Sequence, residues 1–591
     1  MSITILKPRQ RRKLFDALCG SGGTMDGAIA ALTERDIDYD AIAVNHWDMA
    51  VESHKANFPN VQHFTQDMET VNVRALVDEY LDGYVDYFML SAACQDFSPA
   101  GQGKKRNDQR RNHAHFLVEA ITEVPVRRIF FENVPAFQKW GPLCEREGGH
   151  TGKCALAWEP PDMLPPAKPS MRCNTRLKGG DAWGEPYLGR SFQGWYNDIV
   201  KCGWNFQFWP NVNAADYGAP TDRVRLIGVG QREHGPVFFP APTHCDPKKI
   251  AMRQQTAGNM FPELALKPWR TASEIIRWDH PGRSLFDTKP RRKDGKAKAP
   301  NTMARLAQGA LDHWGPVGPA VAWAFTDIGL DETSPVAIEA LIRLSEMPHT
   351  SDGIPILPYV LEQTDGLILG QHGGNVADAA SASPTPTITG GGYVTMAQAM
   401  VIPWGPKCGV QGVDVPLPVQ LTKDRFGLAQ GMLMTRLGAI VPNFGERPDQ
   451  SPRNHSIHAP LPCVTSHGAG GFAQPGFAAA DDDSVSRKRL VQTADGQTFK
   501  IEVLFRMFMK TELLDAQGAS PGYIVLGNQK DQMEQIGNMV SPPVAKAFIG
   551  AQEDADARML VVPQPLRTVT PLPVGRVTAL DRQKVRRGAA S

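Results

Sequence analysis

The chain has 591 residues, of which 42% are hydrophobic and 21% are charged, and its formal net charge at pH 7 is +1. This composition is ordinary for a soluble globular protein, and the length predicts two to four domains. A net charge so close to zero excludes attraction of the chain as a whole to a polyanion, so any such binding must come from local patches.

Three further features of the sequence indicate the cellular compartment of the protein. No run of about 18 apolar residues occurs, so no membrane span is expected, and the first fifteen residues hold no apolar stretch long enough for a signal peptide. The nine cysteines are irregularly spread, unlike a secreted disulfide framework. These features predict a cytoplasmic protein with reduced thiols and no membrane partner.

Short apolar runs alternate with helical patterns in the first part of the chain. We expect strands in residues 13–23, 39–48, 85–94 and 126–134, and helices in residues 24–36 and 49–58. This alternation predicts the α/β class, with a doubly wound, mostly parallel sheet. Ligands of such sheets bind beyond the carboxyl ends of the strands.

The pattern changes along the rest of the chain. Residues 141–189 are rich in Pro, Gly and Cys and read as an insertion, whereas residues 196–230 resume with helix, strand, turn and strand. Residues 301–500 are loop-rich and predict a second, smaller domain. The last helix is expected in residues 541–560. After Val561 the chain carries six Lys or Arg against one Asp, so we expect a basic, disordered tail over 556–591.

Polar residues cluster where the predicted strands end. The glycines of "DALCGSGG" allow a ligand to approach the backbone closely, although a turn of this kind is as often structural. Trp47 of "VNHWD" suits stacking on an adenine base, with a polar neighbour at the ribose, but it also suits a core position. Asp67 of "FTQD" could accept from an adenine amino group.

Cys94 of "SAACQDFS" and Glu132 of "FFENV" follow two further strands. A thiol and a carboxyl group at such positions suit a nucleophile and a proton donor. Cys94 could instead be a buried core thiol or a metal ligand.

The order of these segments resembles the DNA cytosine-5 methyltransferase family, in its phage and prokaryotic branch. The resemblance rests on "LFDALCGSGG", "NHWD", "ACQDFSPAG", "ENV", "NAADYGAPTDRVR" and "QIGNMVSPP". It implies a Rossmann-like methyltransferase domain in residues 1–300, a target recognition domain in 301–500, and a segment in 501–555 that returns to the first domain. It also implies a monomer that transfers a methyl group from S-adenosylmethionine to carbon 5 of a cytosine flipped out of double-stranded DNA.

The resemblance also assigns residue roles. Cys94 would add to carbon 6 of the base, Glu132 would bind the ring nitrogen and donate a proton, and Arg223 and Arg225 would hold the base carbonyl and a neighbouring phosphate. The cofactor pocket would comprise Asp16, Leu18, Gly20, Gly22, Gly23, His46, Trp47, Asp67, Asn538 and Val540. The basic stretch 98–112 would close over the flipped base.

Three positions depart from the family pattern. Ala93 stands where the family has proline, His46 where it has an acidic residue, and Thr221 where it has glutamine. Transfer of a carboxymethyl group from a modified cofactor is therefore a second reading of the same motifs. A third interpretation is a transfer RNA cytosine methyltransferase, and a fourth is a DNA-binding homologue without catalytic activity.

The insertion carries a separate hypothesis. Cys144, His150, Cys154 and Cys173 lie in a Gly- and Pro-rich segment with little apolar content. Four soft ligands of this kind could hold a structural zinc ion, or the three cysteines could be free thiols.

Overall fold

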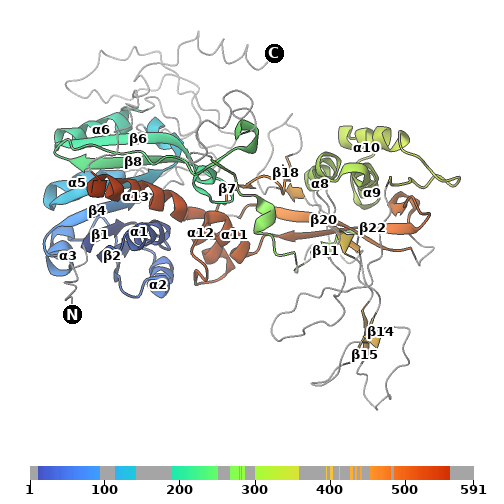
Figure 1. The fold of residues 1–591 in the computed structure, drawn as a ribbon, viewed down its shortest axis with the longest axis horizontal. Helices are drawn as coiled ribbons and strands as arrows, with labels where there is room; N and C mark the ends of the chain where they lie inside the picture. The colour runs from blue at the N-terminus through green and yellow to red at the C-terminus, as the bar shows by residue number, and fades with distance from the viewer. Residues whose placement is uncertain are drawn as a thin grey trace, which may run out of the picture. The chain divides into compact units, whose positions relative to one another are not determined.

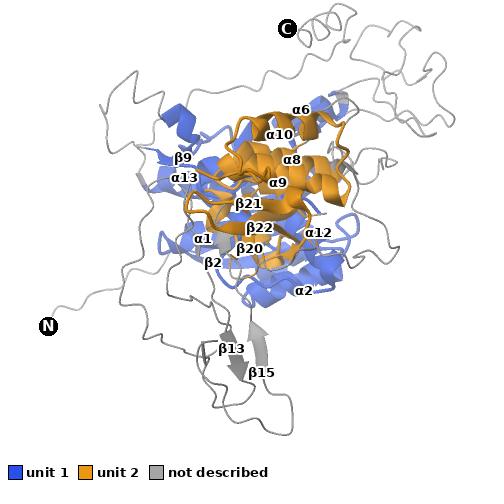
Figure 2. Cartoon of the chain, turned by 90° about the vertical axis from the view of Figure 1, so that its right-hand side faces the viewer, with its two compact units in different colours: residues 1–270, 463–467, 514–591 blue, residues 271–462, 468–513 orange. Residues whose placement is uncertain are grey.

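The fold is that of a computed structural model of the whole chain. It describes residues 11–92, 113–140, 189–250, 266–278, 280, 282–286, 300–358, 453–466, 468–480 and 485–558, together with short strands between 394 and 441. The chain divides into two compact units, coloured blue and orange in Figure 2. Unit 1 comprises residues 1–270, 463–467 and 514–591, and unit 2 comprises residues 271–462 and 468–513.

Unit 1 is built on a seven-stranded sheet in the order β3-β2-β1-β4-β5-β8-β6 (Figure 1). Its strands are β1 (Arg11–Ala17), β2 (Asp38–Asn45), β3 (Gln62–Thr65), β4 (Val85–Ser91), β5 (Val126–Asn133), β6 (Trp204–Asn213) and β8 (Val224–Arg232). The strands β1 to β5 pair in parallel, and β8 pairs antiparallel with both β5 and β6, so β6 runs in the same direction as β1 to β5. The predicted α/β class with a mostly parallel sheet is confirmed.

Helices cover both faces of this sheet. The helices of unit 1 are α1 (Gly23–Thr33), α2 (Asp48–Asn57), α3 (Val73–Tyr80), α5 (Phe116–Glu123), α6 (Arg190–Lys201), α12 (Gln529–Asn538) and α13 (Pro542–Arg558), and α11 (Lys510–Gln517) begins in unit 2 and ends in unit 1. One apolar cluster joins the sheet to α3, α5 and α6, and a second joins its other face to α1 and α13. The unit is therefore a three-layer sandwich, as a doubly wound sheet requires.

The two faces follow from the alternation of side chains along each strand. Phe15 and Phe88 stack on the face of α3 and α5, with ring centroids 5.0 Å apart. Leu14 and Tyr87, one residue earlier on the same two strands, belong to the cluster on the other face. Because both faces are buried, the strands read as continuous apolar runs in the sequence.

Two glycines of α1 allow the start of α13 to approach closely. A Cβ atom at Gly23 would lie 2.2 Å from the carbonyl oxygen of Val540, and one at Gly27 would lie 2.3 Å from that of Pro542. Such distances are shorter than any non-bonded contact, so only glycine permits this approach. The last helix of unit 1 therefore lies directly on its first helix.

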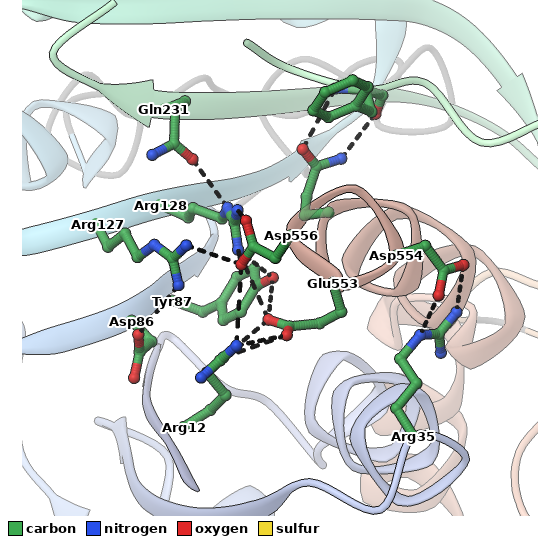
Figure 3. A network of polar contacts seen from close by, with 12 residues as sticks. Arg12, Arg35, Asp86, Tyr87, Arg127, Arg128, Gln231, Glu553, Asp554 and Asp556 are labelled. Atoms are coloured by element: carbon green, nitrogen blue, oxygen red, sulfur yellow. Dashed lines mark hydrogen bonds and ion pairs between the residues drawn. The ribbon is translucent and has the colours of Figure 1, made fainter. Parts of the chain in front are cut away.

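A buried polar network fixes α13 to the strands (Figure 3). Glu553, with a side chain only 1% exposed, accepts hydrogen bonds from Arg12 at 2.8 Å and from the Tyr87 hydroxyl at 2.7 Å. Arg128 donates to the Tyr87 oxygen at 3.1 Å and to Asp556 at 2.5 Å. Burial raises the pKa of Tyr87 well above its ordinary value, so its hydroxyl keeps the proton that it donates.

The helix α13 lies within the range predicted for the last helix, residues 541–560, and overlaps the start of the predicted tail. The predicted tail begins at residue 556, but the helix continues to Arg558, and Asp556 pairs with both Arg127 and Arg128. Two arginines on β5 therefore hold the last turn of α13 in place. Residues 559–591, where the rest of the tail was expected, lie outside the described residues.

In its described residues, unit 2 combines an antiparallel sheet with three helices. Its longest strands are β20 (Gly471–Ala479) and β22 (Thr498–Met507), which are joined by β11 (Arg283–Ser284), β12 (Val394–Thr395), β16 (Leu433–Thr435), β17 (Ala439–Val441), β18 (His455–Ser456) and β21 (Leu490–Gln492). A separate small sheet contains β13 (Met400–Pro403), β14 (Gln411–Gly412) and β15 (Phe426–Ala429). The helices α8 (Pro300–His313), α9 (Gly318–Ala324) and α10 (Pro335–Ser345) share one apolar core with the larger sheet.

The helices of unit 2 differ from the loops predicted from residue 301. Met303, Leu306, Ala307 and Ala310 are fully buried and recur at intervals of three, one and three residues, which places them on one face of α8. The region therefore begins with a helical layer, and its unit boundary lies at residue 271 instead of 301. Among the helices described, none is both long and apolar enough to cross a membrane.

The buried network yields a stability prediction. Glu553→Gln keeps the shape of the side chain but removes the negative charge beside two buried guanidinium groups, which we expect to lower the free energy of unfolding by about 3 kcal/mol. The matched control is Asp554→Asn on the same helix. Its partner Arg35 is 25% exposed and Asp554 is 41% exposed, so we expect a loss of less than about 1 kcal/mol. Urea unfolding measures the free energy of unfolding of both variants. If both variants lost the same amount of stability, the structural role given to Glu553 would be wrong.

Candidate active site

The turn after β1 forms the first edge of the site. Leu18 and Gly20 both have φ of 55°, and Gly22 has φ of 103°, so the chain passes through the left-handed region three times before α1 begins. The Cys19 amide donates to the Val44 carbonyl at 3.2 Å, which ties the turn to β2. The Tyr523 hydroxyl donates to the Ser21 carbonyl at 2.5 Å from the opposite side.

The three predicted cofactor glycines differ in what surrounds them. A Cβ atom at Gly22 would lie 2.6 Å from the Phe58 ring, and one at Gly23 would meet Val540. At Gly20, no described atom lies within 4 Å of the corresponding position. Gly22 and Gly23 are therefore required by the packing of the protein itself, and Gly20 borders open space where a ligand could lie.

A buried acid lies beneath this turn. Asp16 is 0% exposed, and within the ranges that the structure describes neither of its carboxyl oxygens has a hydrogen-bond partner. Burial raises the pKa of Asp16 well above its ordinary value. The Ser21 hydroxyl nearby in the chain is also buried without a described partner.

His54 lies beside Asp16, and His63 lies beside His54. His54 Nε2 is 3.9 Å from Asp16 Oδ2, and His54 Nδ1 is 2.8 Å from His63 Nε2. Burial lowers the pKa of His54 to about 3; burial, followed by the charge of His54, lowers the pKa of His63 to about 4. Both rings are therefore neutral at pH 7, and His54 offers Asp16 no counter-charge.

The ends of β2 and β3 carry the other predicted cofactor residues. His46 is exposed and Trp47 is half-buried at the start of α2, where the Trp47 amide donates to Asn45 Oδ1 at 3.0 Å. Asp67 is exposed beyond β3 and accepts from the Glu69 amide at 3.0 Å. These three side chains thus follow neighbouring parallel strands at one edge of the sheet.

Glu132 and Arg225 form an ion pair at the end of β5. Arg225 Nε lies 3.0 Å from Glu132 Oε1, with side chains 14% and 7% exposed. The antiparallel strand β8 begins beside the end of β5, where Glu132 pairs with Ile227, and this register brings Arg225 to the carboxylate. The arginine also donates to the Val224 carbonyl at 2.8 Å, so its position is fixed from two sides.

Two polar features of this edge were missed in the sequence. Asn133 is 0% exposed, and its side-chain amide donates to the Ala92 carbonyl at 3.2 Å. The Ser91 and Thr24 hydroxyl oxygens are 3.3 Å apart, so the end of β4 is linked to the first turn of α1. An amide directly after the candidate acid Glu132 in "FFENV" was the signal that could have identified Asn133.

Arg223 lies in a different environment from Arg225. The residue is only 1% exposed, and its guanidinium donates to the carbonyls of Val464 at 3.0 Å, Gly537 at 3.1 Å and Met539 at 2.7 Å. The base and phosphate contacts predicted for Arg223 remain untested. The same guanidinium also lies 3.9 Å from the Cys463 sulfur.

The two predicted cofactor residues from the end of the chain lie between α12 and α13. Asn538 is exposed as the last residue of α12, whereas Val540 is only 5% exposed. The Val540 carbonyl faces Gly23, so this turn directly adjoins the start of α1.

Several predicted residues lie outside the described residues. They include the nucleophile Cys94, its neighbour Ala93, the basic stretch 98–112, and the four zinc ligands Cys144, His150, Cys154 and Cys173. In the part of the chain that is described, no group of three or more His, Cys, Asp or Glu side chains could hold a metal ion. The zinc site therefore stays a prediction.

The described residues fit the cofactor that the resemblance implies. An indole, a carboxylate and an imidazole at adjoining strand ends suit an adenine ring and a ribose. Gly20 leaves open space beside them, and the buried carboxyl group of Asp16 has unused acceptor capacity. Leu18 is 9% exposed in the same turn and offers apolar surface.

Three comparisons with known proteins bear on this site. The family model for C-5 cytosine-specific DNA methylases matches residues 13–140. The Type II methyltransferase M1.HphI of Haemophilus parahaemolyticus is 24% identical over 197 residues, which are 33% of this chain and 40% of that relative.

Two methyltransferases are among the solved structures to which the chain was aligned. That of Entamoeba histolytica EhMeth is 10% identical, with a TM-score of 0.38, and the alignment covers 93% of this chain and 99% of that one. That of S. pombe Dnmt2 is 11% identical, with a TM-score of 0.29, and the alignment covers 49% and 67%.

The matched residues contain most of the site. They begin within β1, and they include the glycine-rich turn, His46, Trp47, Asp67, Cys94 and Glu132. It is this part of the chain, residues 13–140, that matches the C-5 cytosine-specific DNA methylase family.

Proposed function

We propose that this protein is a DNA cytosine-5 methyltransferase that modifies a base flipped out of double-stranded DNA. The Glu132–Arg225 pair is the observation that carries the proposal. It lies at the end of β5, and Ser91, the last residue of β4, pairs with Glu132 in the sheet. Cys94 follows Ser91 by three residues, which span at most about 11 Å, so the chain length allows its thiol to approach the carboxyl group.

The chemistry required at this edge is the activation of a weak carbon nucleophile. The Cys94 thiolate adds to carbon 6 of cytosine, forming a sulfur–carbon bond and moving an electron pair toward carbon 5 and the ring nitrogen. Glu132 donates a proton to that nitrogen, and Arg225 holds the carboxyl group in place. Carbon 5 then takes the methyl group. A base or water removes the proton from carbon 5, the thiolate leaves carbon 6, and the ring nitrogen returns its proton to Glu132, which restores the aromatic ring.

S-adenosylmethionine, when bound, supplies an electrophilic methyl group on a sulfonium. We infer that Trp47, His46 and Asp67 hold its nucleoside and that Gly20 allows the close approach of the rest of the molecule. Gly22, Gly23 and Val540 support this pocket through their own packing. A buried carboxyl group in Asp16 would gain a counter-charge from a cationic ligand beside it, which favours its ionised form.

The remaining parts of the proposal rest on the resemblance. Unit 2 would contact the base edges of the target site, and residues 98–112 would close over the flipped base. Because the substrate is DNA, we expect the protein to act in the cytoplasm of a bacterial or phage-infected cell.

The covalent step is tested by trapping. Incubation with the cofactor and DNA that contains 5-fluorocytosine should give a conjugate that survives denaturation, because fluorine blocks the loss of the group on carbon 5. We expect Cys94→Ala to abolish the conjugate. The control Cys202→Ala alters a half-buried thiol after α6 and should leave it intact. If the unaltered protein forms no conjugate at a confirmed target site, the covalent mechanism is wrong.

Mass spectrometry of the modified nucleic acid identifies the product. We expect an added methyl group on cytosine of DNA. A carboxymethyl group would favour the modified cofactor, and modification of transfer RNA alone would replace the DNA substrate.

The proton donor is tested by Glu132→Gln. We expect kcat to fall by about 100-fold or more, which is the usual contribution of general acid catalysis, because the amide cannot donate the acidic proton. Binding of S-adenosylhomocysteine, measured by calorimetry, should not change. Glu123→Gln, at the exposed end of α5, is the matched control. A Glu132→Gln variant with kcat within about threefold of the unaltered protein would contradict this role.

A further inference from the structure

The two arginines of "PTDRVR" have separate partners. Arg225 reaches the carboxylate of Glu132, whereas Arg223 is buried and donates to three backbone carbonyls. We propose that Arg223 is a positioning residue that holds the turn at residues 537–540 against α1 and thereby sets the affinity for the cofactor. This inference rests on the proposed function of the same site.

The acceptors of Arg223 come from two distant parts of unit 1. Val464 belongs to the short segment 463–467, whereas Gly537 lies in the last turn of α12 and Met539 follows that helix. A guanidinium presents several donors in a rigid fork, so it can hold separate carbonyls in a fixed arrangement. Its charge makes each of these bonds stronger than a bond between neutral groups.

The segments that Arg223 joins are in direct contact. A Cβ atom at Gly537 would lie 2.1 Å from the Ser466 amide nitrogen and 2.1 Å from the Thr465 carbonyl carbon. The two backbones therefore touch at this glycine, and Arg223 lies beside the contact. Without the bonds from Arg223, carbonyls of both segments would lose hydrogen-bond partners inside the protein, which is unfavourable for buried groups.

The turn at 537–540 also touches the cofactor side of the site. At Gly23, a Cβ atom would lie 2.2 Å from the Val540 carbonyl oxygen and 2.5 Å from the Met539 side chain. Gly23 is the first residue of α1, directly after the glycine-rich turn. A displacement of Met539 or Val540 would therefore change the position of the turn that borders the cofactor.

The backbone of Arg223 is itself well anchored. Its amide donates to the Thr221 carbonyl at 3.0 Å, and its carbonyl accepts from the Ala214 amide at 2.9 Å. On the far side of the turn, Gln517 donates to the Ile536 carbonyl at 2.8 Å, and Ser541 donates to the Gln517 carbonyl at 2.9 Å. The turn at 537–540 is thus held from one side by Arg223, whose own backbone is anchored, and from the other side by the hydrogen bonds of Gln517 and Ser541. Of these residues, only Arg223 is charged.

The test compares Arg223→Met and Arg223→Lys with Arg232→Met, an exposed arginine at the end of β8. We expect the Kd for S-adenosylhomocysteine to rise about tenfold in Arg223→Met, equivalent to about 1.4 kcal/mol. In Arg223→Lys it should rise about threefold, since an ammonium cannot reach all three carbonyls. The Arg232→Met variant should bind like the unaltered protein.

Kinetics separate positioning from direct substrate contact and from a loss of folding. At saturating cofactor, kcat and the KM for DNA should stay within about threefold of those of the unaltered protein. If cofactor affinity is unchanged while the KM for DNA or kcat changes, Arg223 contacts the substrate and the proposal is wrong. If the lost binding equals the fraction of unfolded protein measured by circular dichroism, the role is only structural and the proposal is also wrong.

A second variant covers the case in which Arg223→Met does not fold. Gly537→Ala forces the same turn away from Thr465 and Ser466 and should also weaken cofactor binding without a large change in kcat. Unchanged cofactor affinity in a folded Gly537→Ala variant would contradict the proposal.

The same measurements separate this proposal from the proposed function. If the unaltered protein binds S-adenosylhomocysteine but methylates no nucleic acid, the proposed function is wrong. The affinities of the variants for S-adenosylhomocysteine still decide the role of Arg223.

Discussion

The close contact between α1 and the backbone of residues 540–542 is the constraint on which the site depends. Gly23 and Gly27 permit it, because any side chain there would overlap the carbonyls of Val540 and Pro542. The buried network around Glu553 then holds α13 to the strands at the other end of the helix. A chain end more than 500 residues from the first strand thus becomes one side of the glycine-rich turn. The turn cannot keep its shape unless the chain's last segments are in place.

Electrostatics divide the strand-end site into two parts. Beneath the glycine-rich turn, burial raises the pKa of Asp16 and lowers the pKa of His54, so the surroundings favour neutral groups. A cation bound there would reverse this preference for Asp16, since the carboxylate would gain the partner that His54 does not supply. Beside β5, by contrast, the Glu132–Arg225 pair keeps opposite charges together. One part is suited to accept a charged ligand and the other to hold an acid in a fixed orientation.

Local patterns in the sequence predicted the sheet of unit 1 well, because its buried strands are continuous apolar runs that end in polar residues. The same reasoning failed for α8. Its apolar face is formed by small and medium side chains such as Ala307 and Ala310, and the many Gly, Pro and Thr residues further along obscured it. Composition averaged over residues 301–500 is a poor guide to a helix of 14 residues. Periodicity within that stretch was the informative signal.

The roles of individual site residues were harder to predict, because they depend on residues that are distant in sequence. The motif "CGSGG" suggests a ligand loop, yet Gly22 and Gly23 are required by Phe58 and Val540, and only Gly20 of these three borders open space. In the same way, Arg223 and Arg225 are two residues apart, but their partners come from 464–539 and from β5. A motif therefore records a set of structural requirements that can differ from one position to the next. At this site one short motif, "PTDRVR", contains both Arg223, which holds the turn at 537–540, and Arg225, which orients Glu132. Because the two arginines have separate partners, a substitution of one need not affect the role of the other.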